Sequence, residues 1–303
     1  MRFRLPGPSW LALGVAMAYA LGVLVVLLGL RPFGRAVLVV LASFLILALW
    51  WSTIRPSNDR DWAREYAHIP YGELDGDRLT LHNVRNFDYR SETDFTDRWE
   101  TRTYDLSKLT EVDLFMSYWG SPMIAHTILS WVFADGPPLA VSIETRRERT
   151  ESYSALRGFF REYEICYVAA DERDLIRLRT NYRGEDVYLY RLRTPLDRAR
   201  ALLLDYVKSM NELKDRPSWY NALTDNCTTT IRTHTKALGG FAALDWRVLA
   251  NGYADQMLYE RGALDTQLPF AELKKQCWID AKGRAADQDP AYSERIRDGV
   301  PRP

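Results

Sequence analysis

The residue with the clearest chemical potential in this chain is a single cysteine. Cys227 follows Asp225 and Asn226, and either of these two residues is a good helix N-cap. The sequence therefore predicts a helix over 227–238 that begins at the cysteine. A thiol in the first turn lies near the positive end of the helix dipole and near N–H groups that lack helical partners. Both favour the thiolate and can hold an oxyanion. A buried structural cysteine is the alternative.

A cysteine nucleophile needs a base, and the chain has four histidines. His234 lies two turns along the same predicted helix, about 10 Å from Cys227, too far to take its proton, and we expect it at the surface. His68 in a loop and His82 on a strand bounded by charged residues are weaker candidates. His126, at the entry to an apolar strand, is the best candidate base. A histidine satisfied within the core is the alternative for His126.

Hairpin geometry suggests a partner for this histidine. The run ADGPP (134–138) is a strong turn signal between two apolar strands. If it closes a hairpin, His126 lies across from positions 144–146, where side chains are about 5 Å apart. Glu144 is the acidic residue in that window, and Ser142 shares its face. An ionised Glu144 would fix the imidazole tautomer, unless it pairs instead with an arginine of TRRER (145–149).

Several other chemistries find no support. The chain has no pair of histidines at metal-ligand spacing and no CxxC motif, so we predict no metal site, and no glycine-rich phosphate loop, so we predict no cofactor. Its 40 basic and 40 acidic residues cancel, which argues against a nucleic-acid partner. Cys166 and Cys277 could form one disulfide in an oxidising compartment or stay reduced in the cytoplasm, and the sequence leaves both open.

The elements that must position these residues change type along the chain. Strand-like segments come first, and a helix follows, with Thr194 as its expected N-cap and Pro195 as its first residue. A meander of antiparallel strands followed by helices predicts an α+β fold. The segments expected as strands are 77–90, 111–120, 124–133, 138–148, 163–169 and 185–193.

Two uncharged apolar runs precede this domain. Leu5–Leu30 and Ala36–Ile54 carry no charged residue, and each is long enough to cross a bilayer, which takes roughly 20 helical residues. Only RPFGR (31–35) separates them, so we expect a transmembrane hairpin with helices at about 9–30 and 36–54. Lys and Arg counts around the two spans are nearly balanced and weakly favour a cytoplasmic C-terminal domain. The predicted organisation is a membrane segment over 1–55 and a soluble domain over 61–303.

The three motifs together resemble the Lnb-type periplasmic domain family, within the NlpC/P60-like group of papain-related cysteine enzymes. They are SPMIAHTILSWVF (121–133), LAVSIETRRER (139–149) and YNALTDNCTTTIRTHTKAL (220–238). The resemblance covers roughly residues 60 to 260, with the histidine strand before the cysteine helix, a permuted order. It leaves a C-terminal extension from about 260 outside the family region. It implies a permuted papain-like domain with an antiparallel sheet and helices.

By position, the resemblance implies that Cys227 is the nucleophile and His126 the base, with Glu144 as orienter by geometry. Asn226 and Tyr220 are further candidates for contacts with the substrate or its oxyanion. For the family's namesake, it implies transfer of an acyl chain from a membrane phospholipid to the N-terminus of a lipoprotein. It also implies a bacterial inner-membrane protein with its soluble domain in the periplasm, against the weak charge count, and with phospholipid and lipoprotein as partners.

Three functions follow as expectations. The first is a membrane-anchored acyltransferase that forms a thioester on Cys227. The second is a hydrolase of cell-wall peptide or another amide bond, with the same residues and water as acceptor. The third is a membrane-tethered binding module without turnover, in which Cys227 is buried and far from His126. Aromatic residues near the site, Trp219 and Tyr220, slightly favour an apolar acyl channel but are equally consistent with core packing.

Overall fold

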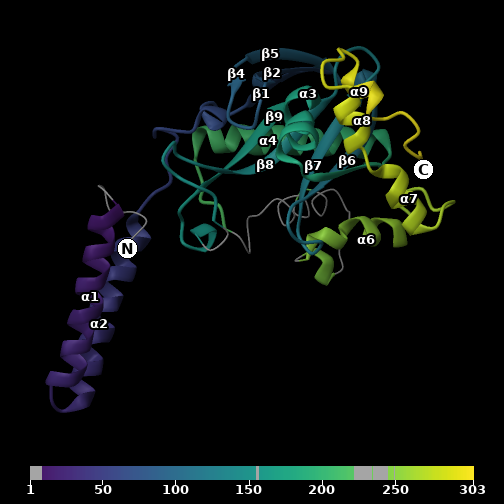
Figure 1. Cartoon of the computed structure of the whole chain (residues 1–303). Helices are drawn as coiled ribbons and strands as arrows, with labels where there is room; N and C mark the ends of the chain where they lie inside the picture. The colour runs from purple at the N-terminus through teal and green to yellow at the C-terminus, as the bar shows by residue number, and fades with distance from the viewer. Residues whose placement is uncertain (1–8, 155–156, 222–233, 235–244, 249) are drawn as a thin grey trace. The chain divides into compact units, whose positions relative to one another are not determined.

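A computed structural model of the chain describes residues 9–154, 157–221, 234, 245–248 and 250–303. Its contacts divide the chain into two units, Met1–Ser57 and Asn58–Pro303. The first unit contains two helices, α1 (Ser9–Gly29) and α2 (Phe33–Thr53) (Figure 1). Both are long and apolar enough to cross a membrane, and most of their side chains face outward. Tyr19 and Ser43 share an interhelical hydrogen bond of 3.0 Å between their hydroxyl oxygens.

The second apolar helix begins at Phe33, earlier than predicted. The prediction started at Ala36 because Arg35 is charged, but a charged residue in the first turn of an apolar helix can reach the polar boundary with its long side chain. The short connection between the helices agrees with the expected hairpin.

The second unit is built on one eight-stranded sheet with the order β1-β2-β9-β8-β7-β6-β10, and β5 pairs with β2 outside this path. All pairs are antiparallel except β2–β9. The strands are β1 (Tyr71–Asp75), β2 (Arg78–Arg85), β5 (Trp99–Asp105), β6 (Leu109–Tyr118), β7 (Ala125–Phe133), β8 (Leu139–Arg146), β9 (Glu164–Ala170) and β10 (Asp186–Arg191). A separate small sheet pairs β3 (Asp88–Tyr89) with β4 (Phe95–Thr96).

Helices pack around this sheet, and most of them follow its last strand in the chain, whereas α3 lies between β9 and β10. The longer ones are α3 (Glu172–Arg177), α4 (Leu196–Asp215), α6 (Ala254–Glu260), α7 (Phe270–Cys277), α8 (Asp280–Ala285) and α9 (Tyr292–Arg295). A π-helix, η4 (Leu178–Arg183), continues α3 without a break. The short 3₁₀ turns are η1 (Arg64–Tyr66), η2 (Leu106–Lys108), η3 (Arg157–Phe159), η5 (Trp246–Val248) and η6 (Asn251–Tyr253). The α+β prediction is confirmed.

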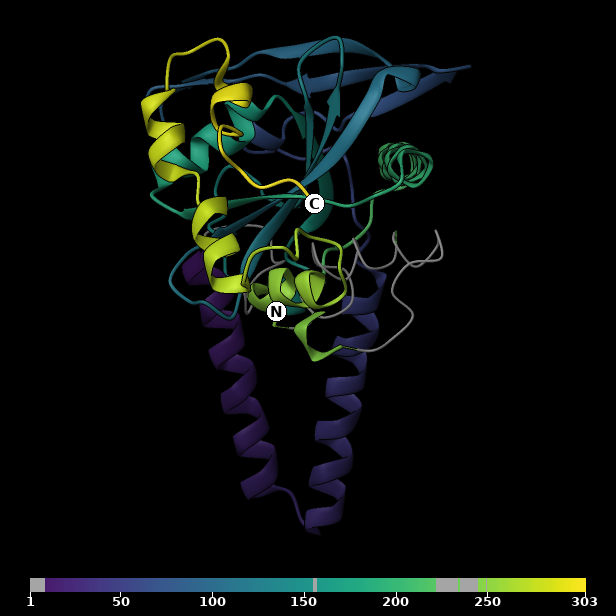
Figure 2. The same ribbon diagram turned by 90° about the vertical axis from the view of Figure 1, so that its right-hand side faces the viewer.

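The two faces of the sheet carry different kinds of side chain. Residues alternate between faces along a strand, so Ser130 and Trp131 of β7 point in opposite directions. Trp131 donates to the carbonyl of Ala199 on α4 (2.9 Å), whereas Ser130 donates to Glu172 on α3 (2.6 Å). Figure 2 shows α4 end-on at one side of the sheet, with α8 and α9 at the other. His126 lies four residues before Ser130 on the same strand, so it also faces the α3 side.

Two sequence predictions about these elements need correction. The expected strand over 77–90 ends at Arg85, and Asp88–Tyr89 form the separate strand β3, which pairs with β4 in the small sheet. Within β2, Asn83, with φ of +58°, lies at a bulge that shifts the register with β5 between Leu81 and Val84. The helix expected to be capped by Thr194 is capped by Pro195, whose ψ of 140° is extended, and it begins at Leu196. The fixed φ of proline suits both positions, so the sequence could not distinguish them.

A buried charge cluster fastens the C-terminal part of the chain to the α3 face. Arg297, just beyond α9, contacts Asp113 of β6 at 2.9 Å and Glu172 of α3 at 2.6 Å. Arg191 of β10 contacts the other oxygen of Asp113 at 3.0 Å. Both carboxylates are completely buried. Charges so placed are tolerated only while their partners remain, because an uncompensated buried ion costs several kcal/mol.

We expect Arg297→Met to lower the free energy of unfolding by about 3–5 kcal/mol, because it leaves two buried carboxylates with one cation fewer. Urea unfolding of the detergent-solubilised chain, followed by tryptophan fluorescence, measures this. The matched control is Arg295→Met, which removes an arginine that is 60% exposed and pairs with Asp289 at the surface. The control should change stability by about 0.5 kcal/mol at most. Equal effects of the two variants would contradict this role for the cluster.

Candidate functional site

His126 and Glu144 meet on the α3 face of the β7–β8 hairpin. Trp131 lies opposite Leu139 and Ile128 opposite Ser142, which is the register predicted from the ADGPP turn. His126 Nε2 lies 2.6 Å from Ser142 Oγ and 3.2 Å from Glu144 Oε1. The side chains of His126 and Glu144 are only 12% and 17% exposed. The structure thus brings the predicted base and its predicted orienter together, with Ser142 between them.

The hydrogen-bond pattern selects one tautomer of the histidine. Ser142 Oγ donates its single proton to Glu144 Oε1 over 2.7 Å. Its oxygen can therefore only accept from the imidazole, so Nε2 carries the proton. In this tautomer Nδ1 is the basic nitrogen of His126. A ring held in this way is suited to accept a proton from a group that approaches Nδ1.

Arg179 contacts the same oxygen of Glu144 that Ser142 contacts. Its Nη2 donates to Glu144 Oε1 over 3.0 Å, and its side chain is only 3% exposed. Burial would raise the pKa of the Glu144 carboxyl, but His126, Arg179 and the hydrogen bond from Ser142 hold this pKa well below its ordinary value. Glu144 is therefore ionised at neutral pH. The arginines of TRRER bond elsewhere: Arg146 to Asn58, Arg147 to Glu65 and Arg149 to Asp61.

A second acid closes a ring of polar contacts around these groups. Glu185 Oε2 lies 3.7 Å from Arg179 Nε and accepts a hydrogen bond from Ser117 of β6. Ser117 is the residue opposite His126 in the β6–β7 register. The contacts therefore run from His126 through Glu144, Arg179 and Glu185 and return to the strand beside His126. Each charged group in this ring has an opposite charge as its neighbour.

The π-helix η4 explains how Arg179 reaches this position. A π turn inserts one residue into a helix and redirects the side chains that follow, and such turns are frequent at functional sites. Here η4 follows α3 directly, and Arg179 Nη1 donates back to the carbonyl of Leu175 over 2.7 Å. The guanidinium is thereby held rigidly against the sheet. Helical spacing in the sequence gives no signal for this turn, so Arg179 could not be predicted as a partner of Glu144.

We expect Arg179→Met to move the NMR titration midpoint of His126 upward. Loss of a cation beside Glu144 leaves the full carboxylate charge to stabilise the imidazolium. Arg179→Lys keeps a cation and should return most of the shift. The control is Arg177→Met, because Arg177 is equally buried on α3 but pairs with Asp88. A similar shift in the Arg177 variant would mean that general loosening of the helix, and not the charge at 179, acts on His126.

Asn251 fixes the start of the strand that carries His126. Its Oδ1 accepts from the Ala125 N–H (2.9 Å), and its Nδ2 donates to the Ala125 carbonyl (2.6 Å). The next residue, Gly252, donates its N–H to Met123 O over 3.0 Å. A Cβ at Gly252 would lie 2.1 Å from the Pro122 carbonyl oxygen, so only glycine fits there. This clasp, from a part of the chain far from β7 in sequence, was also missed by the sequence analysis.

A second clasp of the same kind provides a matched control. Asn211 of α4 makes the same two bonds to the backbone of Gly72 on β1, each 2.8 Å long. We expect Asn251→Ala and Asn211→Ala each to lower the free energy of unfolding by about 2 kcal/mol, because each leaves two backbone groups without their partner. Only Asn251→Ala should shift the NMR resonances of the His126 ring. A comparable shift in the Asn211 variant would contradict a local role for Asn251.

The other predicted site residues have different outcomes. Cys227 and Asn226 lie outside the described residues, so their roles stay predictions. Tyr220 is described: its N–H donates to the carbonyl of Tyr163 over 2.9 Å, and its side chain packs against the core. Its predicted contact with substrate also stays a prediction.

The prediction that His234 lies at the surface is wrong. His234 is only 4% exposed; its Nδ1 donates to Asp205 Oδ2 of α4 (2.6 Å), and its Nε2 accepts from the hydroxyl of Tyr167 on β9 (2.7 Å). Burial lowers the pKa of His234 in spite of Asp205. Helical spacing could not reveal that α4 covers this position. His234 is thus a neutral linker between two elements of the fold.

The two weaker histidine candidates lie in other surroundings. His82 of β2 stacks on Tyr71 with ring centroids 4.5 Å apart and bonds to Thr101. His68 packs edge-on against Trp99. Among the described residues, neither histidine is in contact with Glu144, so His126 remains the predicted base.

Cys166 and Cys277 are free thiols in buried positions. Burial raises the pKa of each thiol to about 12, which makes both poor nucleophiles. Cys166 lies on β9 and Cys277 at the end of α7, whose next residue, Trp278, bridges to β10. Three strands separate β9 from β10, at roughly 4.8 Å per step, so the two sulfurs lie too far apart for a disulfide.

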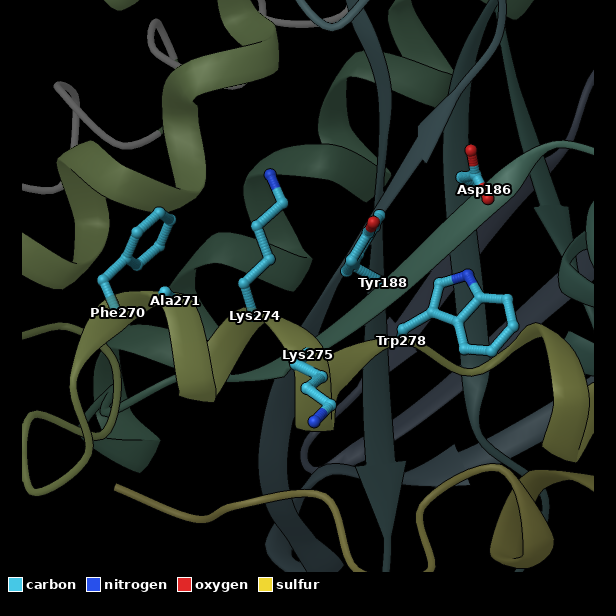
Figure 3. A pocket seen from close by; sticks show the side chains of 7 residues that line it. All are labelled: Asp186, Tyr188, Phe270, Ala271, Lys274, Lys275 and Trp278. Atoms are coloured by element: carbon cyan, nitrogen blue, oxygen red, sulfur yellow. The ribbon is translucent and has the colours of Figure 1, made fainter.

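A separate groove of about 580 Å³ lies between α7 and β10 (Figure 3). The residues that line it are Asp186, Tyr188, Phe270, Ala271, Lys274, Lys275 and Trp278. The Lys274 ammonium is paired with the buried Asp255 at 2.7 Å. Val187 shares a row with Ser117 and His126, so its neighbours Asp186 and Tyr188 point to the opposite face of the sheet. The groove is therefore not part of the His126 cluster.

Among the described residues, no group of three or more His, Cys, Asp and Glu side chains is arranged to hold a metal ion. The polar cluster around His126 consists instead of acids paired with arginines and serines. The group in this cluster that is suited to chemistry is the oriented imidazole of His126.

The fold and this cluster define an α+β domain that carries an oriented histidine, in a chain with two membrane-length apolar helices. Residues 95–252 match the Lnb N-terminal periplasmic domain, which is more than half of the chain. The chain therefore belongs to this family, as its motifs suggested, and is a periplasmic, membrane-associated module. Comparisons with curated proteins and with solved structures gave no match. The matched segment includes His126, Glu144, Arg179 and Asn251, and it ends before α6.

Proposed function

We propose that this protein is a cysteine acyltransferase of the bacterial cell envelope, anchored in the inner membrane by α1 and α2. Cys227 is the nucleophile, His126 the base, and Glu144 the group that orients the base. The acyl donor is a membrane phospholipid, and the acceptor is the N-terminal amine of a lipoprotein. The observation that carries this proposal is the alignment of His126, Ser142 and Glu144 inside the segment that matches the family.

The geometry supports the first half of the reaction as follows. Nδ1 of His126 takes the proton from the Cys227 thiol, and Glu144, with Ser142, stabilises the imidazolium through Nε2–H. The thiolate attacks an ester carbonyl of the phospholipid. N–H groups at the start of the predicted 227–238 helix hold the oxyanion. The C–O bond then breaks, and the departing alkoxide takes the proton from His126, which leaves an acyl thioester on Cys227 and a lysophospholipid.

The second half reverses the roles. The acceptor amine attacks the thioester carbonyl, and His126 takes the proton that the amine loses. The C–S bond breaks, the thiolate of Cys227 departs and regains a proton from His126, and the product is an amide. Water in place of the amine would give hydrolysis, so the same residues serve the alternative hydrolase function. The transfer reaction requires that water be kept from the thioester while the amine enters.

Membrane anchoring supports a lipid substrate. A site held at the membrane surface by its own helices meets phospholipid at a high effective concentration. A periplasmic domain places the N-terminus and residues 58–303 on the periplasmic side. The RPFGR loop, with Arg31 and Arg35, then lies in the cytoplasm, against the weak preference of the Lys and Arg count.

The test is the detection of the acyl-enzyme. Detergent-purified protein is incubated with phospholipid, and intact and peptide mass spectrometry is used to find a hydroxylamine-labile acyl adduct on Cys227. We expect the adduct in wild type and its loss in Cys227→Ala. His126→Ala should slow its formation by about 10²–10⁴-fold, the usual contribution of a general base. His82→Ala is the matched control and should leave the rate unchanged.

Each other result has a definite meaning. Absence of an adduct on a Cys227 that alkylates rapidly at neutral pH would reject lipid transfer and favour the hydrolase. A Cys227 that resists alkylation until the protein is unfolded would reject both enzymes and favour the binding module.

A further inference from the structure

The loop between β6 and β7 exposes an apolar rim beside His126. Trp119, Met123 and Ile124 are 46%, 53% and 54% exposed, although the loop that carries them joins two largely buried strands. The rings of Trp119 and His126 lie with their centroids 6.4 Å apart. Single exposed apolar residues are ordinary, but three large ones on one short loop at a candidate site mark a contact surface. We name these three side chains the apolar rim.

The loop that carries the rim is held in a defined shape. Ser121 donates its N–H to the Trp119 carbonyl over 2.9 Å, and the Met123 N–H donates to Ser121 Oγ over 3.2 Å. The Gly252 N–H donates to the Met123 carbonyl, and Asn251 clasps Ala125 directly after the rim. The exposure of these side chains is therefore built into the loop. Contact of Trp119, Met123 and Ile124 with water is unfavourable in free energy, and an apolar partner that covered them would remove this cost.

We infer that the apolar rim contacts the lipid surface of the membrane and guides the acyl chain of a phospholipid to His126. Three observations favour lipid over a protein partner. The chain carries two helices that are long and apolar enough to cross a bilayer. None of the exposed rim side chains is charged, and tryptophan is the residue most typical of the boundary between water and lipid. The rim also adjoins the histidine that the proposed function assigns to acyl transfer, so contact with lipid and access to the site coincide.

This inference deepens the proposed function, but lipid contact can be measured without catalysis. In the full chain with Cys227→Ala, Cys166 and Cys277 are 2% and 1% exposed and should not label. Met123→Cys then carries an environment-sensitive fluorophore, and the protein is reconstituted in vesicles of phosphatidylethanolamine and phosphatidylglycerol. The control is Leu74→Cys, because Leu74 is also half exposed but lies on the edge strand β1.

We expect lipids with a nitroxide on the acyl chain to quench the label at 123 severalfold more than the label at 74. Iodide in the water should quench the label at 74 more strongly. Equal quenching at both positions, or a label at 123 that only iodide reaches, would overturn the inference and favour a water-borne partner for the rim.

A second measurement ties the rim to the reaction. Met123→Glu should reduce formation of the Cys227 adduct from vesicle phospholipid by about tenfold or more, because a carboxylate at the lipid boundary opposes entry. Leu74→Glu should leave the adduct unchanged. Lipid quenching without any adduct would reject the proposed function and keep the inference. An adduct without lipid quenching, or one that forms equally in Met123→Glu, would reject the inference and keep the function.

Discussion

The site depends on keeping one buried carboxylate ionised. Glu144 lies under the α3 face, where an unpaired charge would cost several kcal/mol, and it is tolerated because donors from three residues converge on one oxygen. Each donor comes from a different element: His126 from β7, Ser142 from β8 itself and Arg179 from η4. The register of the hairpin and the placement of the π-helix are therefore not independent. A slip of either would leave the carboxylate short of a donor and the imidazole without an orienting partner.

The need to keep the buried Glu144 carboxylate ionised also explains why the two faces of the sheet differ. The α4 side is a conventional packed interface, with Trp131, Tyr206 and Tyr167 in contact through edge-on rings. Among the described residues, the α3 side instead buries paired charges in three groups: the ring around Glu144, the Asp113, Glu172 and Arg297 cluster, and the Arg85–Asp174 pair. Paired charges fix geometry more strictly than apolar contacts, because a small displacement breaks a hydrogen bond. Such strict geometry suits a face that holds the imidazole of His126 in one tautomer.

Local sequence predicted the parts of the site that lie within one hairpin. A turn signal fixed the β7–β8 register, and the register alone placed Glu144 near His126. Arg179 and Asn251 could not be found in this way, because they reach Glu144 and Ala125, the neighbours of His126, through tertiary packing: one from a π turn, the other from a short 3₁₀ turn late in the chain. The burial of His234 has the same origin, since only the packing of α4 and β9 reveals it. Amphipathic periodicity in a sequence identifies which face of a helix or strand is buried, but not which other element packs on that face.

The contacts of Arg297 also affect the order in which the domain can fold. Arg297 lies 184 positions after Asp113, the carboxylate that it neutralises inside the sheet. A domain delivered across the membrane as an extended chain exposes β6 long before Arg297 emerges. Until then the sheet would have to bury Asp113 and Glu172 without one of their cations, which favours a loose, incomplete core. Final packing of this core is therefore tied to the late arrival of Arg297 in the chain.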